Sequence, residues 1–122
     1  MENLKGFVKE YIEAWSTTDL NTRRNLVKKI YEEKAIFYAS EPGDNAVIRT
    51  GWDSIFENIT EVNSRLVVDN GFSTRDIGYL SNHNVLRVMW EMRTQNGEVA
   101  MTGMNFLILH NYKIKYDYIF IS

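Results

Sequence analysis

Hydrophobic residues recur at helical spacing through the first half of the chain. The stripe over residues 4–15 has intervals of three and four positions, which predicts a helix with one buried face. A polar break follows, and Asp19 is a good N-cap for a second helix over residues 20–31. A similar stripe over residues 52–62 predicts a third helix. The sequence Thr50-Gly51-Trp52-Asp53 resembles a capping box for the first turn of that helix.

Beyond residue 66 the pattern changes to that of strands. Four strands are expected, covering roughly residues 72–80, 85–94, 99–109 and 113–121. Asn96-Gly97 is a favoured dipeptide for a tight two-residue turn between the second and third of them. A short strand over residues 35–38 comes earlier and ends at a loop that holds the only proline, Pro42. Helices followed by an antiparallel meander are typical of an α+β domain.

The hairpin over residues 83–109 is apolar on both faces and holds one amide, Asn105, in the middle of its return strand. A hairpin this long suggests a sheet wrapped around a cavity, with Asn105 as a polar anchor. The outer sheet face is also apolar and needs cover, which a second copy of the chain could provide. We therefore expect a homodimer through the outer face. The alternative is an adaptor whose aromatic outer face contacts a different protein.

Composition limits the classes of function. A chain of 122 residues that is 44% hydrophobic fits one compact domain, residues 1–122. The net charge of -2 offers no electrostatic footprint for nucleic acid, whose binding depends on clustered basic residues. Arg23, Arg24, Lys28 and Lys29 do cluster, but they fall on the polar side of the second helix. We expect them to form a solvated face.

Several cofactor and membrane classes are not expected. The chain has no cysteine, which excludes disulfides and thiolate metal ligands. Its histidines and carboxylates lack helical metal-ligand spacing, and it has no glycine-rich phosphate loop, so neither a metal nor a cofactor is expected. No apolar run reaches membrane-spanning length and no signal core is visible, so we expect a cytoplasmic protein without membrane partners.

Three ordered patterns resemble one known family. They are Tyr11-Ile12-Glu13-Ala14-Trp15 followed by Thr18-Asp19; Ala35-Ile36-Phe37-Tyr38 followed by Thr50-Gly51-Trp52-Asp53; and Arg87-Val88-Met89-Trp90-Glu91 followed by Gly103-Met104-Asn105-Phe106 and Lys113-Ile114. In this order they resemble the SnoaL-like branch of the nuclear transport factor 2-like superfamily. The resemblance spans nearly the whole chain. It implies a cone-shaped α+β domain, in which N-terminal helices pack on a strongly curved antiparallel or mixed sheet that encloses a pocket.

The resemblance also implies candidate catalytic positions. In isomerase-like members an aspartate removes a proton, while a tyrosine and an acid hold the developing oxyanion. Tyr11 matches the tyrosine. Asn105 matches the acid, although a gap in the last turn would move the match to Met104. An asparagine can donate and accept hydrogen bonds but does not titrate.

The base position departs from the family pattern. Ala39 or Ser40 stands where the aspartate is expected, and neither is an adequate base there. Glu41 and Asp44 lie nearby, in a loop where carboxylates are normally solvated. The remaining acid of interest is therefore Asp117.

Two orientations are open for Asp117. If it shares an inward face with Ile119 and Ile121, an apolar cavity would raise its pKa and make it a useful base near neutral pH. If residues 116, 118 and 120 point inward instead, Asp117 lies on the surface or in the dimer interface. A slip of one residue would exchange the two faces of the strand.

The expected ligand-binding set adds aromatic residues to the polar anchors. It comprises Tyr11, Trp15, Tyr38, Trp52, Phe56, Trp90 and Asn105. His83 and His110 flank turns and are expected at the surface. The leading hypothesis is a homodimer that binds a small, largely apolar molecule without secure catalytic machinery. The second is an isomerase, cyclase or dehydratase for a small hydrophobic carbonyl or polyketide-like substrate. It would use Asp117 as base, with Tyr11 and Asn105 as oxyanion donors.

Overall fold

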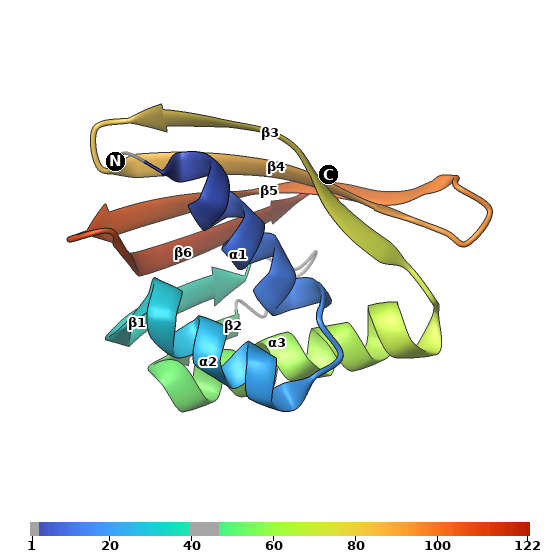
Figure 1. The fold of residues 1–122 in the computed structure, drawn as a ribbon, viewed down its shortest axis with the longest axis horizontal. Coiled ribbons are helices and arrows are strands. Elements are labelled where there is room, and N and C mark those ends of the chain that lie inside the picture. The colour runs from blue at the N-terminus through green and yellow to red at the C-terminus, as the bar shows by residue number, and fades with distance from the viewer. Residues whose placement is uncertain (1–2, 40–46) are drawn as a thin grey trace.

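The computed structural model describes residues 3–39 and 47–122. Within these residues, three α-helices lie against one face of a six-stranded sheet (Figure 1). The elements run in the order α1 (Leu4–Ser16), α2 (Leu20–Ile30), β1 (Tyr31–Ala39), β2 (Val47–Thr50), α3 (Trp52–Asn63), the π-helix η1 (Ser64–Asp69), β3 (Ser73–Asn82), β4 (Val85–Arg93), β5 (Val99–His110) and β6 (Lys113–Ile121). The expected α+β fold with helices packed on one face of a mixed sheet is confirmed.

The sheet is mixed and strongly curved. Its strand order is β2-β1-β6-β5-β4-β3, and only the β1–β6 pair is parallel. Each of the four strand pairs other than β1–β2 contains a register shift, and such bulges bend and twist a sheet. In β3 the shift falls between Asp76 and Gly78, and Gly78 has a φ of +143°, which favours glycine. The bent β3 is the edge strand of the sheet and contacts α1 (Figure 1).

Several boundaries differ from the sequence prediction. Asp19 caps α2 as expected, accepting hydrogen bonds from the amides of residues 21 and 22. The helix ends at Ile30, however, and Tyr31 already belongs to β1, which is longer than the predicted strand over residues 35–38. The capping box was wrong: Gly51, with a φ of +87°, is the N-cap of α3 and no side chain caps that end. The elements β2 and η1 were not predicted, and the loop with Pro42 lies outside the described residues.

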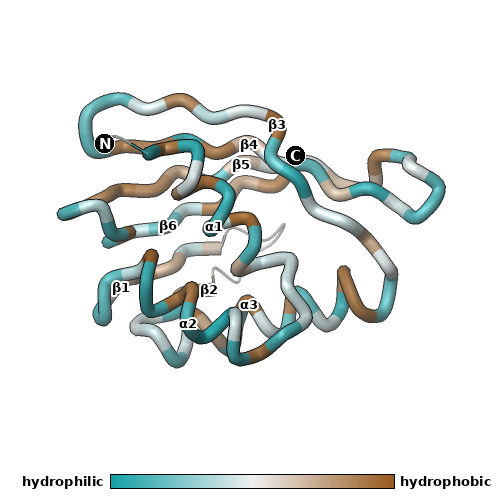
Figure 2. The backbone as a smooth tube through the Cα atoms, in the orientation of Figure 1, coloured by the Kyte–Doolittle hydropathy of each residue, from teal (hydrophilic) through white to brown (hydrophobic). Residues whose placement is uncertain are grey.

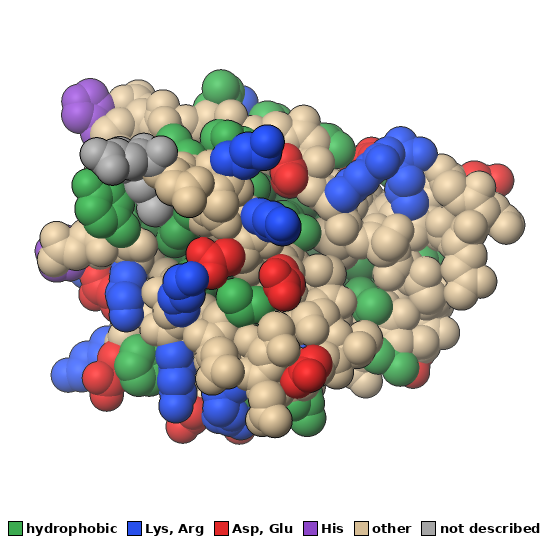
Figure 3. All heavy atoms as spheres, viewed as in Figure 1, with side chains coloured by type: hydrophobic (Ala, Val, Ile, Leu, Met, Phe, Trp, Pro, Cys, Tyr) green, Lys and Arg blue, Asp and Glu red, His purple; other side chains and the backbone are tan. Residues whose placement is uncertain are grey.

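Arg23 is buried, contrary to the solvated face expected for the basic cluster. The residue is 1% exposed, and its guanidinium forms hydrogen bonds with carbonyl oxygens at the C-terminal end of α1. The guanidinium Nε donates to the carbonyl oxygen of Ala14 at 2.9 Å, Nη1 donates to Thr60 Oγ1 at 3.1 Å, and Nη2 donates to the carbonyl of Thr17. The last carbonyls of a helix lack partners within the helix, and a cation is stabilised there. Arg24, Lys28 and Lys29 are exposed as predicted, in a surface where basic and acidic side chains are mixed (Figure 3).

The α1 end also binds α3. Asn63 Nδ2 donates to the carbonyl oxygen of Trp15 at 2.9 Å, and the Thr17 amide donates to the carbonyl of Glu13 at 2.8 Å. Together with Arg23, these contacts give the terminal carbonyls of α1 partners from α2 and α3. The C-terminal end of α1 is therefore held by both α2 and α3.

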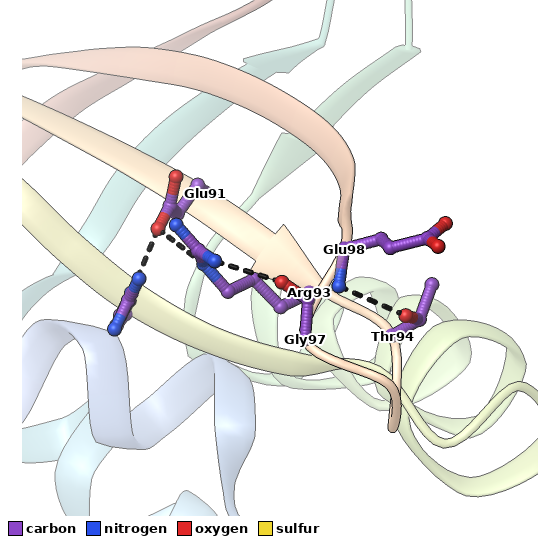
Figure 4. A network of polar contacts seen from close by, with 6 residues as sticks. Glu91, Arg93, Thr94, Gly97 and Glu98 are labelled. Atoms are coloured by element: carbon purple, nitrogen blue, oxygen red, sulfur yellow. Dashed lines mark hydrogen bonds and ion pairs between the residues drawn. The ribbon is translucent and has the colours of Figure 1, made fainter.

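The β4–β5 hairpin ends in a polar turn. Gln95–Gly97 form a three-residue loop rather than the predicted two-residue turn, because the Thr94 amide donates to the Glu98 carbonyl at 2.8 Å and Gly97 adopts a φ of +84°. Next to it, Glu91 Oε1 accepts from Arg75 Nε at 2.7 Å and from Arg93 Nε at 2.8 Å (Figure 4). The hydrogen bond from Arg93, then that from Arg75, lowers the pKa of Glu91.

The two faces of the sheet differ in their neighbours. Inward residues such as Leu86, Val88 and Leu107 are fully buried with α1 and α3 in one core. The outer face carries aromatic rings without such cover: Tyr38 and Tyr118 stack with centroids 4.7 Å apart, and Phe106 meets Phe120 edge-on at 5.7 Å. Hydrophilic residues gather at the hairpin ends (Figure 2). None of the helices in the described ranges has the length and apolar character needed to cross a membrane.

Candidate ligand cavity

A cavity of about 230 Å³ lies between the helices and the inner face of the sheet. Its wall is mostly apolar and includes Ile12 and Trp15 from α1, Val62 from α3, and Trp90 from β4. The π-helix contributes Arg65, Leu66 and Val67. Such i→i+5 turns often occur at functional sites. The polar wall residues include Tyr11, Asn58, Asn63, Thr74 and Asn105.

A buried carboxylate organises the polar residues behind this wall. Asp117 on β6 is 0% exposed. Its Oδ2 accepts from the hydroxyls of Tyr11, at 2.9 Å, and Tyr31, at 2.6 Å, while Oδ1 accepts from Asn105 Nδ2 at 2.7 Å. The three donors come from α1, β1 and β5. Asp117 thus joins the first helix to both neighbours of its own strand.

Burial dominates the titration of this cluster. It raises the pKa of Asp117 to about 6, although the hydrogen bonds from Tyr31, Asn105 and Tyr11 act in the opposite direction. Burial, followed by the charge of Asp117, raises the pKa of both tyrosines well above the usual value. Both phenols are therefore neutral hydrogen-bond donors at physiological pH.

The orientation of Asn105 is fixed from a second side. Trp90 Nε1 donates to Asn105 Oδ1 at 2.8 Å, which leaves the amide nitrogen to face Asp117. Trp90 can reach Asn105 because it pairs with Gly103, and the indole lies across the glycine. A Cβ at position 103 would come within 2.8 Å of the Phe120 carbonyl oxygen and closer still to the Trp90 ring. The Gly103-x-Asn105 pattern therefore has a steric reason.

Solved structures with the same arrangement are numerous. A SnoaL-like family protein from Agrobacterium tumefaciens, described as a candidate isomerase, superposes with a TM-score of 0.85 at 18% identity, covering 100% of this chain and 99% of that one. A nuclear transport factor 2-like protein of unknown function from Mesorhizobium loti gives 0.73 at 8% identity, covering 99% and 92%. The chain has the nuclear transport factor 2-like fold. A candidate polyketide cyclase from Sinorhizobium meliloti gives 0.68 at 13% identity, covering 97% and 96%.

These structural similarities establish the fold of the chain but not its activity. No family model matches the sequence, and no curated protein matches it. Nuclear transport factor 2-like folds, like other widespread folds, host different functions on one scaffold. The function must therefore be argued from the residues of the cavity.

The structure brings four of the seven expected ligand-binding residues to the cavity. Tyr11, Trp15, Trp90 and Asn105 all line it. The other three lie elsewhere. Tyr38 stacks on Tyr118 at the outer face, Trp52 donates from its indole to the Tyr31 carbonyl at 2.8 Å, and Phe56 packs beneath the guanidinium of Arg24 beside α2.

The structure also shows where the candidate positions for the family's acid and base lie. Asn105 faces inward, whereas Met104 pairs with Met89 and Phe120 on the opposite face. Ala39 lines the cavity at the expected base position, and Ser40, Glu41 and Asp44 lie outside the described residues. His83 and His110 are exposed, as expected.

The Asp117 side chain faces inward, but it does not line the cavity. It lies behind Tyr11, which lines the cavity and donates a hydrogen bond to it. The enzyme hypothesis requires a carboxylate that reaches the ligand directly. Among residues 3–39 and 47–122, no cluster of three or more His, Asp or Glu side chains could hold a metal ion. Apart from Arg65 of η1, the polar groups that this wall offers a ligand are neutral hydrogen-bonding side chains.

Sequence reasoning missed Tyr31 and the cavity residues of η1. Tyr31 fits the helical spacing of residues 20–31, so it was assigned to the second helix. Its extended conformation depends on pairing with Ile114, more than 80 positions away in the chain. The π-helix has no comparable sequence signal.

Proposed function

We propose that this chain binds a small, largely apolar molecule in the cavity, as a SnoaL-like protein. The observation that carries the proposal is the cavity itself, about 230 Å³ of space beside the hydrophobic core. Protein interiors normally leave few voids larger than a water molecule. A space of this size, walled by side chains such as Ile12, Val62 and Trp90, is suited to an apolar occupant.

The volume indicates the size of the ligand. An apolar cavity of about 150 Å³ accommodates benzene, and sites for drug-sized molecules begin at about 300 Å³. The intermediate volume suits a molecule with one or two rings. Aromatic walls from Trp15, Phe37 and Trp90 favour a flat ring system.

Binding is better supported than catalysis because of where Asp117 lies. Its carboxylate accepts three hydrogen bonds and does not line the cavity. A general base must come within hydrogen-bonding reach of the proton that it removes. The polar wall groups Tyr11 and Asn105 do not titrate near neutral pH, which suits recognition of a ligand.

A cavity-filling substitution tests the proposal. Small aromatic compounds should raise the melting temperature of the wild-type chain by about 5 °C at ten times the dissociation constant. Val62→Phe places a ring in the cavity and should abolish this shift. The measurement is differential scanning fluorimetry with a panel of one- and two-ring compounds, followed by calorimetric titration of each hit.

The matched control is Val68→Phe. Val68 lies on η1 and is 60% exposed, so the same substitution should leave the ligand-induced shift unchanged. Equal loss in both variants would indicate a general effect on folding. Retention of full binding by Val62→Phe would contradict the cavity as the site.

We also propose that the outer sheet face joins two copies of the chain. Support comes from the stacked and edge-on aromatic pairs on that face, with Phe120 47% exposed. Sedimentation equilibrium should give twice the monomer mass for the wild type. Phe106→Glu should yield monomers, whereas Val68→Glu, at an exposed position away from this face, should not. A monomeric wild type at high micromolar concentration would refute the proposal.

A further inference from the structure

One stripe of the helix formed by α3 and η1 lines the cavity. α3 continues directly into η1, since Ser64 keeps helical dihedral angles where the two meet. Asn58, Val62 and Arg65 follow one another at intervals of four and three residues, which places them on the same side of a helix. All three line the cavity. A ligand that lies along this stripe therefore meets an amide, an apolar side chain and a cation in turn.

Arg65 is the only charged residue that the described ranges contribute to the cavity wall. The residue is exposed, so an anion bound to its guanidinium would keep part of its hydration. Its backbone is held in place, because its carbonyl oxygen accepts from Asn70 Nδ2 at 2.6 Å. A guanidinium can bind a carboxylate through two parallel hydrogen bonds. The open end of the cavity is therefore suited to an acidic group.

Asn58 gives the same stripe a polar group at greater depth. The residue is only 8% exposed and lines the cavity, yet its side chain makes no hydrogen bond to any residue in the described ranges. Its amide atoms are not among the polar atoms that the protein covers completely, so they can be reached from the cavity. Buried amides are almost always hydrogen-bonded. An accessible and unpaired amide in this wall indicates a polar partner on the ligand.

The spacing of the two polar residues indicates how a ligand would lie. Seven residues of helix correspond to about 10 Å along the axis, which suits the two ends of one molecule better than a single group. We infer that the cavity takes a small aromatic acid, with its carboxylate on Arg65 at the exposed end and a hydroxyl or carbonyl group on Asn58 at the buried end. Val62 lies between them, beside the ring. This inference rests on the proposed function, because it names the ligand class for the same cavity.

An acid and its amide test the role of the charge. 3-Phenylpropanoate and 3-phenylpropanamide share one shape and the same number of non-hydrogen atoms, but only the acid is charged near neutral pH. Calorimetric titration of the wild type should show about fivefold tighter binding of the acid, as expected for a partly exposed charge pair. The preference should shrink in about 1 M salt, which screens such a pair.

Arg65→Gln should abolish the preference for the acid and leave the affinity for the amide within about twofold. The matched control is Arg24→Gln. It makes the same change of net charge at another helical arginine, whose side chain is 50% exposed and does not line the cavity, so the preference should persist. Equal loss of the preference in both variants would show that the overall charge of the protein, and not Arg65, attracts the acid.

A hydroxylated acid tests the role of Asn58. 3-(4-Hydroxyphenyl)propanoate carries a hydroxyl at the end of the ring opposite the acid. The wild type should bind it about fivefold more tightly than 3-phenylpropanoate, as expected for one net hydrogen bond. Asn58→Leu keeps the approximate size of the side chain but has no polar atom. It should remove this advantage and leave the affinity for 3-phenylpropanoate within about twofold.

The outcomes separate this inference from the cavity proposal. Equal binding of the acid and its amide by the wild type would overturn the inference and leave the cavity proposal intact. A preference for the acid with no advantage for the hydroxylated acid would overturn the role of Asn58. Binding of none of these compounds at millimolar concentration, nor of any compound in the wider panel, would overturn both proposals. The wild-type titrations decide the question even if a variant does not fold.

Discussion

Arg23→Met is expected to lower the free energy of unfolding by about 3–5 kcal/mol. Methionine keeps an unbranched apolar stem at this position but removes all three hydrogen bonds of the guanidinium. The carbonyls of Ala14 and Thr17 would then be left without their charged donor at the end of α1. Urea denaturation followed by circular dichroism measures the change.

Arg24→Met serves as the control for this prediction. Arg24 is the next residue of the same helix, its side chain is 50% exposed, and its nearest carboxylate oxygen, in Asp53, is 3.8 Å away. Surface ion pairs of this kind contribute up to about 1 kcal/mol. Similar losses from the two substitutions would show that the buried contacts of Arg23 do not stabilise the helix assembly.

Asp117→Asn should remove a pH dependence of stability between about pH 4 and pH 7. The pKa of Asp117 rises from 3.8 to about 6 on folding, so the folded state binds the proton more tightly than the unfolded state. Asp117 therefore stabilises the wild type most at a pH below 3.8, the pKa of the group in the unfolded state. That stabilisation, on the order of 3 kcal/mol, is lost as the pH rises through the folded pKa.

The measurement compares the two proteins across that pH range. The stability of the wild type minus that of Asp117→Asn should decrease toward neutral pH, because the other titrating groups are common to both. A difference that stays constant across this range would mean that Asp117 titrates normally in the folded chain.

Much of the fold could be predicted because burial imposes a period on the sequence. The apolar stripes of α1 and α3 follow directly from which face of each helix meets the core, and the apolar runs of β4 and β5 indicate strands. Tyr31 and Arg23 could not be placed in this way. Tyr31 fits a helical stripe but is held in a strand by β6, and Arg23 lies among polar residues but is buried by the end of α1.

The candidate site was predictable only in part for a similar reason. Tyr11 and Asn105 could be assigned from local patterns, and both line the cavity. The orientation of Asp117 could not, because Ile114 and Asp117 both face inward although they are three residues apart. In a regular strand, side chains three residues apart point to opposite faces of the sheet. The register shift near Leu109 lets both of these side chains point inward. Bulges of this kind have no reliable signal in a single sequence.

The central place of β6 has a consequence for biosynthesis. This strand separates β1 from β5, so the ribosome makes five strands before the one that joins them. Until then Tyr11 and Tyr31 lack their shared acceptor, and the nascent chain exposes the edges of β1 and β5. Long-range closure of this kind is slow. Newly made chains should therefore complete this sheet only after β6 has left the exit tunnel of the ribosome.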